Sequence, residues 1–347
     1  MKETQAIDEQ TYMIKGRKDN PFGAAHLNPR DAYRDVPVLK QPTWNNGVAA
    51  YFFFGGISAG AAVVGAIAEL VGGEKQKRLA RVAQYVSFAT LLPCPPLLID
   101  DLGMPGRFHH MLRVFKPQSP MNVGSWALMT HGAAATLKVV KTLTSDGQLL
   151  SKLPIVPGVM RFFPERLIAV VNVPGAILLG GYTGVLLGTT SVPVWHKSQL
   201  LGGLFMSSAF STGVAAISLA TELTGHVDQE EGSKLAALGA MAGITEGVLL
   251  VGYVATSGES RKHLFSGVPG KMMAGAVACL LAATAIEAAS AMTGKHNKGA
   301  SSIASVAALA GGALLRWAVV KAGHGSAADR EGTLAAMSPR EGSPGWG

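Results

Sequence analysis

Eight long apolar stretches dominate this sequence. A membrane-spanning helix needs about 20 mostly apolar residues, because the hydrocarbon core has no water to satisfy exposed backbone groups. The stretches cover residues 44–71, 79–99, 123–143, 167–187, 200–223, 235–256, 268–292 and 303–320. The pattern therefore predicts an all-α integral membrane protein with eight transmembrane helices in an up-and-down bundle.

The composition also favours a membrane protein over a soluble fold. Charged residues make up 15% of the chain, against about 25% in typical soluble domains. The 43 glycines suit a membrane bundle, in which small residues let helix backbones approach closely. The net charge of +8 does not indicate nucleic-acid binding, because the basic residues lie in short loops between the apolar stretches.

The chain divides into three regions. Residues 1–43 are polar and contain several prolines, so we expect an extended arm against a partner and no signal peptide. Residues 44–322 form the membrane domain, and residues 323–347 form a flexible tail rich in Gly, Ser and Ala. The prolines of the run 93–96 predict a break in the second helix. This break marks either a cavity or a bend in the packing.

The loop charges predict an orientation in the membrane. Eight crossings place both termini on one side, side A, together with the loops after the second, fourth and sixth helices. More Lys and Arg residues lie in the loops of the opposite side, side B. The positive-inside rule then places side B in the cytoplasm. We expect a multi-pass protein of the bacterial cytoplasmic (inner) membrane with extracytoplasmic termini.

The chain offers few ligands for a permanent redox cofactor. An iron–sulfur cluster needs about four thiolates, whereas Cys94 and Cys279 both lie in apolar stretches and are interpreted as buried structural thiols. A haem b needs two axial histidines within the spans, and only His131 lies well inside one. We therefore expect no haem, no iron–sulfur cluster and no metal site in this chain.

Several polar residues are predicted near side A. From the helical rise, His131 and Tyr182 are both expected roughly 8–9 Å below this face. A quinone headgroup needs a hydrogen-bond donor at each carbonyl and a nearby acid or base. Glycines on both sides of Tyr182 let another group approach its phenol closely. The remaining candidates for a quinone site at this face are Trp44, Asn45, Asn46, Asp100, Asp101 and Arg107.

A simpler interpretation of the same residues stays open. Tyr182 and Trp44 are also the kind of aromatic residue that forms an interfacial belt. Asp100 and Asp101 then simply end the second helix in water.

Acidic residues in the spans form a second set of candidates. Ionisable groups inside a membrane are costly and usually face the bundle interior or a cavity. Glu246 is predicted at mid-membrane, while Glu287 and Glu222 lie further towards side B. Together with Arg316 in the last helix, they predict a proton path towards the cytoplasm. The alternative is that Glu222 and Glu69 are interfacial and that the remaining acids pair locally.

The first half of the chain contains four distinctive motifs. They are Trp44-x-x-Gly47 with AYFFFGGISAG at 50–60, DLGMPGRF at 101–108, SPMNVGSW at 119–126, and YTGVLL at 182–187 with PVW at 193–195. These motifs resemble the NrfD/PsrC family of membrane subunits in polysulfide-reductase-type complexes, and they occur in the family's order and at sensible spacing. The second half has no sharp motif.

The resemblance implies an eight-helix subunit that docks on a ferredoxin-like iron–sulfur subunit, beside a molybdopterin enzyme or a multihaem cytochrome. It also implies that menaquinone or ubiquinone is exchanged near that partner, with the headgroup bound by the fourth-helix tyrosine, matched here by Tyr182. The family's His/Asn pair at the start of the first helix corresponds to Trp44, Asn45 and Asn46. This sequence has no histidine there.

The predicted function is a membrane anchor and quinone-binding subunit that exchanges electrons between the quinone pool and an iron–sulfur partner, with optional proton translocation. Two alternatives are a purely structural anchor for peripheral redox subunits and a secondary transporter. A transporter should show an internal repeat with matching broken helices. Only the second helix carries a proline-rich break.

Overall fold

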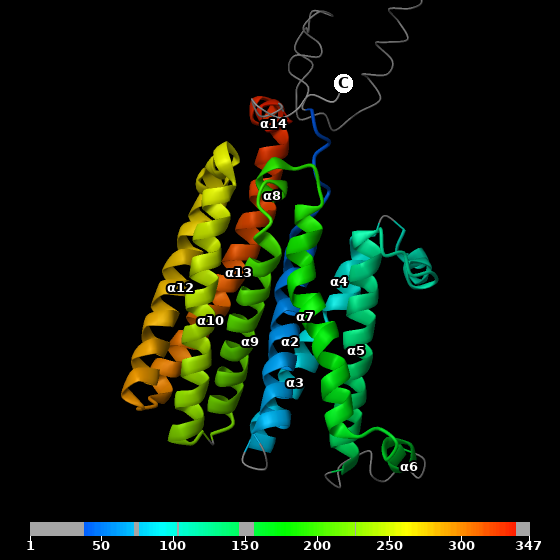
Figure 1. The fold of residues 1–347 in the computed structure, drawn as a ribbon, viewed down its shortest axis with the longest axis vertical. Helices are drawn as coiled ribbons and strands as arrows, with labels where there is room; N and C mark the ends of the chain where they lie inside the picture. Colours follow the sequence, from blue (N-terminus) through cyan, green and yellow to red (C-terminus); the bar gives the residue numbers. More distant parts are fainter. Residues whose placement is uncertain (1–37, 73–75, 103, 146–155, 226, 338–347) are drawn as a thin grey trace, which may run out of the picture. The chain divides into compact units, whose positions relative to one another are not determined.

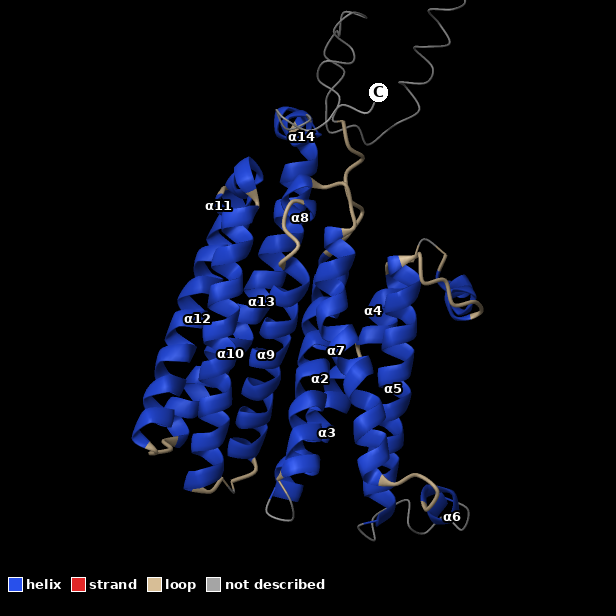
Figure 2. Cartoon of the chain, in the orientation of Figure 1, coloured by secondary structure: helices blue, strands red, loops and turns tan. Residues whose placement is uncertain are grey.

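The computed structural model describes residues 38–72, 76–102, 104–145, 156–225 and 227–337. Throughout these residues the regular secondary structure is helical, with no strand (Figures 1 and 2). The helices belong to one compact unit that begins at Leu39. The expected N-terminal arm lies almost entirely outside the described residues.

Seven helices in the described part of the chain are long and apolar enough to cross a membrane. They are α2 (Asn46–Val71), α3 (Lys77–Leu91) continued by α4 (Cys94–Asp100), α7 (Glu165–Gly188), α9 (Leu201–Leu223), α10 (Gln229–Thr256), α12 (Gly267–Thr293) and α13 (Lys298–Ala328). Helix α5 (Pro120–Ser145) has 26 residues but is less apolar, since it carries His131, Lys138 and Lys141. The helical membrane bundle is thus confirmed, while the eighth crossing stays a prediction.

The long helices form two groups of four. Helices α2, α3, α5 and α7 pack in a ring, and α9, α10, α12 and α13 pack in a second ring (Figure 1). The groups meet mainly where α9 packs against α2 and α7. Consecutive long helices run in opposite directions, so Asn46, Asp100, Gly188 and Thr256 lie at one end. This end, which corresponds to side A, is called end A, and the opposite end is end B.

Small residues allow α2 and α9 to pack closely. A Cβ atom added to Gly60 would overlap the backbone carbonyl of Ala209. A Cβ atom on Gly213 would lie 2.6 Å from the backbone nitrogen of Ala61. These two glycines therefore set the distance between the two groups of helices, as small residues do at membrane helix contacts.

The proline-rich break occurs where the sequence predicts it. Helix α3 ends at Leu91 and α4 begins at Cys94. Cys94 is fully buried, and a Cβ atom on Gly55 of α2 would lie 3.7 Å from its sulfur. This close packing favours a bend in the bundle over a cavity.

The C-terminal region is helical further than expected. The tail was predicted from Gly323, but α13 continues to Ala328 and α14 covers Arg330–Met337. Gly323 packs against Trp195 so closely that a Cβ atom would overlap the indole, a tertiary contact that composition does not reveal. Residues 338–347 lie outside the described residues. The short helices are η2 (Pro105–Leu112), α6 (Val156–Met160), α8 (Pro193–His196), η4 (Gly258–Arg261) and α11 (Lys262–Phe265).

Candidate functional site

Tyr182 is buried at end A between three helices of the first group. Its side chain is 6% exposed. The ring lies directly on Gly124 of α5, where any Cβ atom would overlap it. Tyr51 of α2 is close enough to interact electrostatically with both Tyr182 and Cys94. The site therefore combines two phenols and a thiol from α2, α4 and α7.

His131 lies in a separate hydrogen-bonded network between α2, α3, α5 and α7. Its Nδ1 is 2.8 Å from Oδ1 of Asn172, and its Nε2 is 2.9 Å from Oγ of Ser58. Ser58 Oγ donates to the Ser87 carbonyl at 2.8 Å, and Ser87 Oγ donates to the Ser58 carbonyl at 2.9 Å. All four side chains are buried.

The hydrogen-bond geometry of this network is compatible with either protonation state of His131. If both ring nitrogens of His131 carry protons, they donate to Asn172 and Ser58, and the Ser58 hydroxyl still donates to Ser87. If the ring is neutral, rotation of the Asn172 amide by half a turn lets its NH₂ group donate to Nδ1 instead. Asn172 can thus serve either protonation state of His131.

The prediction that Tyr182 and His131 lie at one depth is wrong. Tyr182 touches Gly124, whereas His131 is two helical turns further along α5, roughly 10 Å deeper. The predicted depth of 8–9 Å corresponds to about six residues of helix, but α5 begins at Pro120, eleven residues before His131. His131 consequently occupies the middle of the bundle, beside the middle of α2.

The residues at the start of α2 cap this helix and pack against its neighbours at end A. Asn45 is the N-cap of α2, and its Oδ1 accepts hydrogen bonds from the backbone N–H groups of Gly47 at 2.7 Å and Val48 at 3.2 Å. Asn46 is exposed. Trp44 stacks on Trp195, with ring centroids 5.2 Å apart. These residues share end A with Tyr182, but the contacts they make are structural.

The acidic residues and the arginine predicted near Tyr182 lie towards the surface. Asp100 ends α4 and is exposed, and Asp101 is its half-buried C-cap. Partial burial, followed by the neighbouring Asp100 carboxylate, raises the pKa of Asp101. Arg107 is exposed on η2. The structure therefore does not bring Arg107 to the buried phenol of Tyr182.

Arg316 and Glu246 come together in the centre of the second group of helices. Arg316 is fully buried and donates to Phe52 O at 3.0 Å and, through Nη1, to Ser208 Oγ at 2.9 Å. Ser208 also bonds Glu246, which interacts electrostatically with Arg316. Room for the guanidinium comes from Gly56, where a Cβ atom would lie 2.6 Å from Nη2.

The acidic residues of the predicted proton path lie along one face of α10. This face presents a small or acidic residue at every seventh position, in steps of roughly 10 Å: Gly232, Gly239 and Glu246. Glu287 of α12 packs on Gly239, and the His296 ring packs on Gly232. Direct proton transfer requires about 3 Å between heavy atoms, or one intervening water. Steps of this length need water molecules between the side chains.

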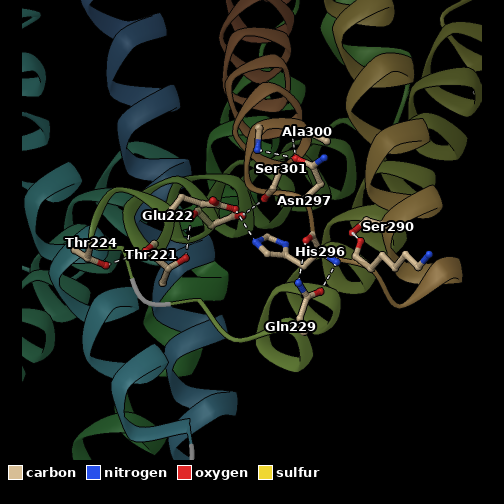
Figure 3. Close-up of polar contacts among 12 residues, drawn as sticks. Thr221, Glu222, Thr224, Gln229, Ser290, His296, Asn297, Ala300 and Ser301 are labelled. Atoms are coloured by element: carbon tan, nitrogen blue, oxygen red, sulfur yellow. Dashed lines mark hydrogen bonds and ion pairs between the residues drawn. The ribbon is translucent and has the colours of Figure 1, made fainter.

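Glu222 ends this series at end B in a buried pair with His296 (Figure 3). His296 Nε2 lies 3.1 Å from Glu222 Oε1, and both side chains are at most 5% exposed. Gln229 fixes the His296 backbone, since its Oε1 accepts from His296 N at 2.7 Å and its Nε2 donates to His296 O at 3.2 Å. Glu222 is therefore buried and paired, whereas the alternative interpretation placed it at the interface.

Sequence reasoning missed several members of these networks. Asn172, Ser58 and Ser208 carry no local signal, because single small polar residues are common in membrane helices. His296 lies in the loop between α12 and α13, but the sequence analysis did not identify its burial against Glu222. It also did not identify the largely buried ion pair that Lys138 forms with Glu69. For His296, the glycine spacing on α10 was a usable signal.

Comparison with known proteins settles the family. The family described as "Polysulphide reductase, NrfD" matches residues 37–326, which is most of the chain. The chain belongs to this NrfD family. The match spans both groups of helices, including Tyr182, His131 and Arg316, and it confirms the resemblance carried by the motifs in the first half.

Two curated relatives are distant and only partly covered. A selenate reductase subunit from Mesobacillus selenatarsenatis is 23% identical over 233 residues, covering 60% of this chain and 55% of the relative. A polysulfide reductase component from Wolinella succinogenes is 27% identical over 183 residues, covering 50% of this chain and 56% of the relative. The matched segments span about half the length of each relative.

Proposed function

We propose that this NrfD protein is the membrane anchor and quinone-binding subunit of a multi-subunit oxidoreductase. It crosses the bacterial cytoplasmic membrane eight times, α5 included, with both termini outside the cytoplasm. It exchanges electrons between menaquinone or ubiquinone and a ferredoxin-like iron–sulfur subunit, beside a molybdopterin or multihaem cytochrome subunit. The named relatives, both parts of reductases, support this role.

The buried position of Tyr182 at end A carries the proposal. Quinone carbonyls accept hydrogen bonds, and the hydroxyls of Tyr182 and Tyr51 are donors held in a largely apolar site. A bound quinone supplies two-electron redox chemistry, while the protein orients the headgroup and supplies protons. His131 lies roughly 10 Å deeper and is therefore not a ligand of the same headgroup.

Tyr182→Phe tests the site, because it keeps the ring on Gly124 and removes only the hydroxyl. We expect quinol turnover of the assembled complex to fall about ten-fold to a hundred-fold, equivalent to the loss of one hydrogen bond to a reacting group. The matched control is Tyr253→Phe, since Tyr253 is fully buried and its hydroxyl donates to Val194 O at 2.9 Å, away from the site. Unchanged quinol turnover in Tyr182→Phe would contradict the assignment of Tyr182 as a quinone ligand.

A purely structural anchor remains the main rival function. It predicts that the purified complex contains no bound quinone and that Tyr182→Phe changes nothing. Extraction of quinone from the complex, quantified per iron–sulfur subunit, separates the two functions. A secondary transporter is less compatible with the fold, because among the described helices the proline-rich break of α3 and α4 has no counterpart in α10.

Proton translocation is a second proposal, supported by Glu246, Glu287 and the Glu222–His296 pair along α10. If protons follow this series, Glu287→Gln lowers the number of protons moved per quinol in proteoliposomes and leaves electron transfer intact. Glu259→Gln, at an exposed position on η4, is the control. An unchanged ratio of protons to electrons in Glu287→Gln rejects this route.

A further inference from the structure

A cavity of about 410 Å³ lies at end A beside η2, outside the site of Tyr182. It is lined by His110, Met111, Arg113, Val114, Lys116, Ser119, Met121 and Asn122. Among these residues, Arg113 and Lys116 are cationic. Since no acidic residue is among the lining residues, the cavity suits an anion.

The wall of the cavity is built by one side chain. Nδ2 of Asn122 donates to Met111 O at 2.7 Å and to Val114 O at 3.2 Å, and its Oδ1 accepts from Lys116 N at 2.7 Å. These bonds hold the loop after η2 against the first turn of α5. The N-terminus of α5 adds the positive end of a helix dipole to the same wall.

The segment that carries the cavity stands outside the bundle. Figure 1 shows it in teal to the right of α5, and its main contacts are with α4 and α5. Phe108, Val114 and Phe115 are exposed beside the cations, and the Phe115 ring meets the edge of Trp126 with centroids 6.0 Å apart. Exposed aromatic residues next to Lys and Arg at a helix end are typical of the membrane interface.

We propose that this cavity binds the phosphate of an anionic phospholipid, and that the acyl chains run down the exposed face of α5. Met121 and Met129 continue the apolar surface from the cavity along that face. Basic pockets at the membrane surface bind lipid headgroups in this way. The inference rests on the proposed membrane crossing of α5, but not on quinone binding.

Native mass spectrometry of the full-length protein in detergent, with equal amounts of phosphatidylglycerol and phosphatidylcholine, tests the proposal. We expect the wild type to retain one phosphatidylglycerol preferentially. R113Q and K116Q each lower that affinity about five-fold, without altering phosphatidylcholine retention. K271Q, which removes an exposed cation near the end A terminus of α12, is the matched control and has no effect.

Several outcomes overturn the proposal. One is equal retention of phosphatidylglycerol and phosphatidylcholine by the wild type. Another is a loss of phosphatidylglycerol in K271Q as large as that in R113Q and K116Q. Displacement of the lipid by an equal concentration of inorganic phosphate shows a site for small anions. A spin label at F115C that is shielded from lipid-dissolved oxygen in the assembled complex shows that the cavity is covered by a partner protein. A null result for Tyr182→Phe changes none of these measurements.

Discussion

Nδ1 of His131 on α5 lies 2.8 Å from Oδ1 of Asn172 on α7, and both side chains are buried in the middle of the first group of helices. The pair joins two successive long helices of the bundle. On the other side of the ring, Ser58 completes the link to α2. His131 is consequently fixed at both nitrogens.

Replacement of Asn172 by leucine should destabilise the protein by about 1–2 kcal/mol. The substitution leaves Nδ1 of His131 buried without a partner, which costs more than the average membrane hydrogen bond of about 0.6 kcal/mol. Unfolding in detergent–denaturant mixtures measures the change. Thr136→Val, which removes an exposed hydroxyl bonded only to its own helix, should be nearly neutral. Equal stabilities of the two variants would contradict the role of the pair.

Single substitutions of Arg316 or Glu246 should be more harmful than the double substitution. Removing one partner leaves an uncompensated buried charge, at a cost of about 3–5 kcal/mol, whereas R316M with E246Q removes both charges. Unfolding free energies of the three variants form a double-mutant cycle. Additive losses would show that the two side chains are energetically independent despite the shared bond to Ser208.

Gly60→Ala should destabilise the contact between α2 and α9 by about 1–3 kcal/mol, because the new Cβ atom forces the two backbones apart. Gly132→Ala is the matched control, since a Cβ atom there meets only a Leu91 methyl group at 3.6 Å. It should be neutral or slightly stabilising, as alanine is the better helix former. Thermal unfolding of both variants in the same detergent distinguishes overpacking from a general effect of substituting glycine.

The stability of the C-terminal end of α13 should depend on the charge of Asp329. Hydrogen bonds from Lys262 and from the Gly332 N–H, and then from His263, hold the pKa of Asp329 well below its usual range. Because this pKa is lowered on folding, its stabilisation is present above the pKa of an unfolded aspartate, about 3.9. It is lost as the pH falls towards the folded value.

Asp329→Asn removes that stabilisation at neutral pH. We expect faster amide hydrogen exchange in α14 and at the end of α13 at pH 7, and a smaller dependence of exchange protection on acid than in the wild type. Glu331→Gln, an exposed neighbour on α14, serves as the control. Wild-type protection in Asp329→Asn would show that the Lys262–Asp329 contact does not hold this end together.

The apolar stretches predicted the helices well, while the polar site was predicted only in part. Seven long helices and the break before Cys94 lie where local hydropathy and prolines placed them. The predicted depth of His131 was wrong, because it depended on where α5 begins. That position is set by the preceding loop and by the Ser119 hydroxyl, which accepts a hydrogen bond from Asn122 N. Arg107 was a candidate for the same site, but η2 carries it to an exposed position.

The sequence alone determined a membrane-embedded helical bundle of the NrfD type, since hydropathy and family motifs are properties of contiguous segments. Tertiary structure alone decided which buried polar groups meet. Arg316 reaches the carbonyl of Phe52, 264 residues away, because α13 and α2 pack beside each other at a position where Gly56 leaves space. Such pairings depend on the rotation and crossing of whole helices, which no single segment encodes.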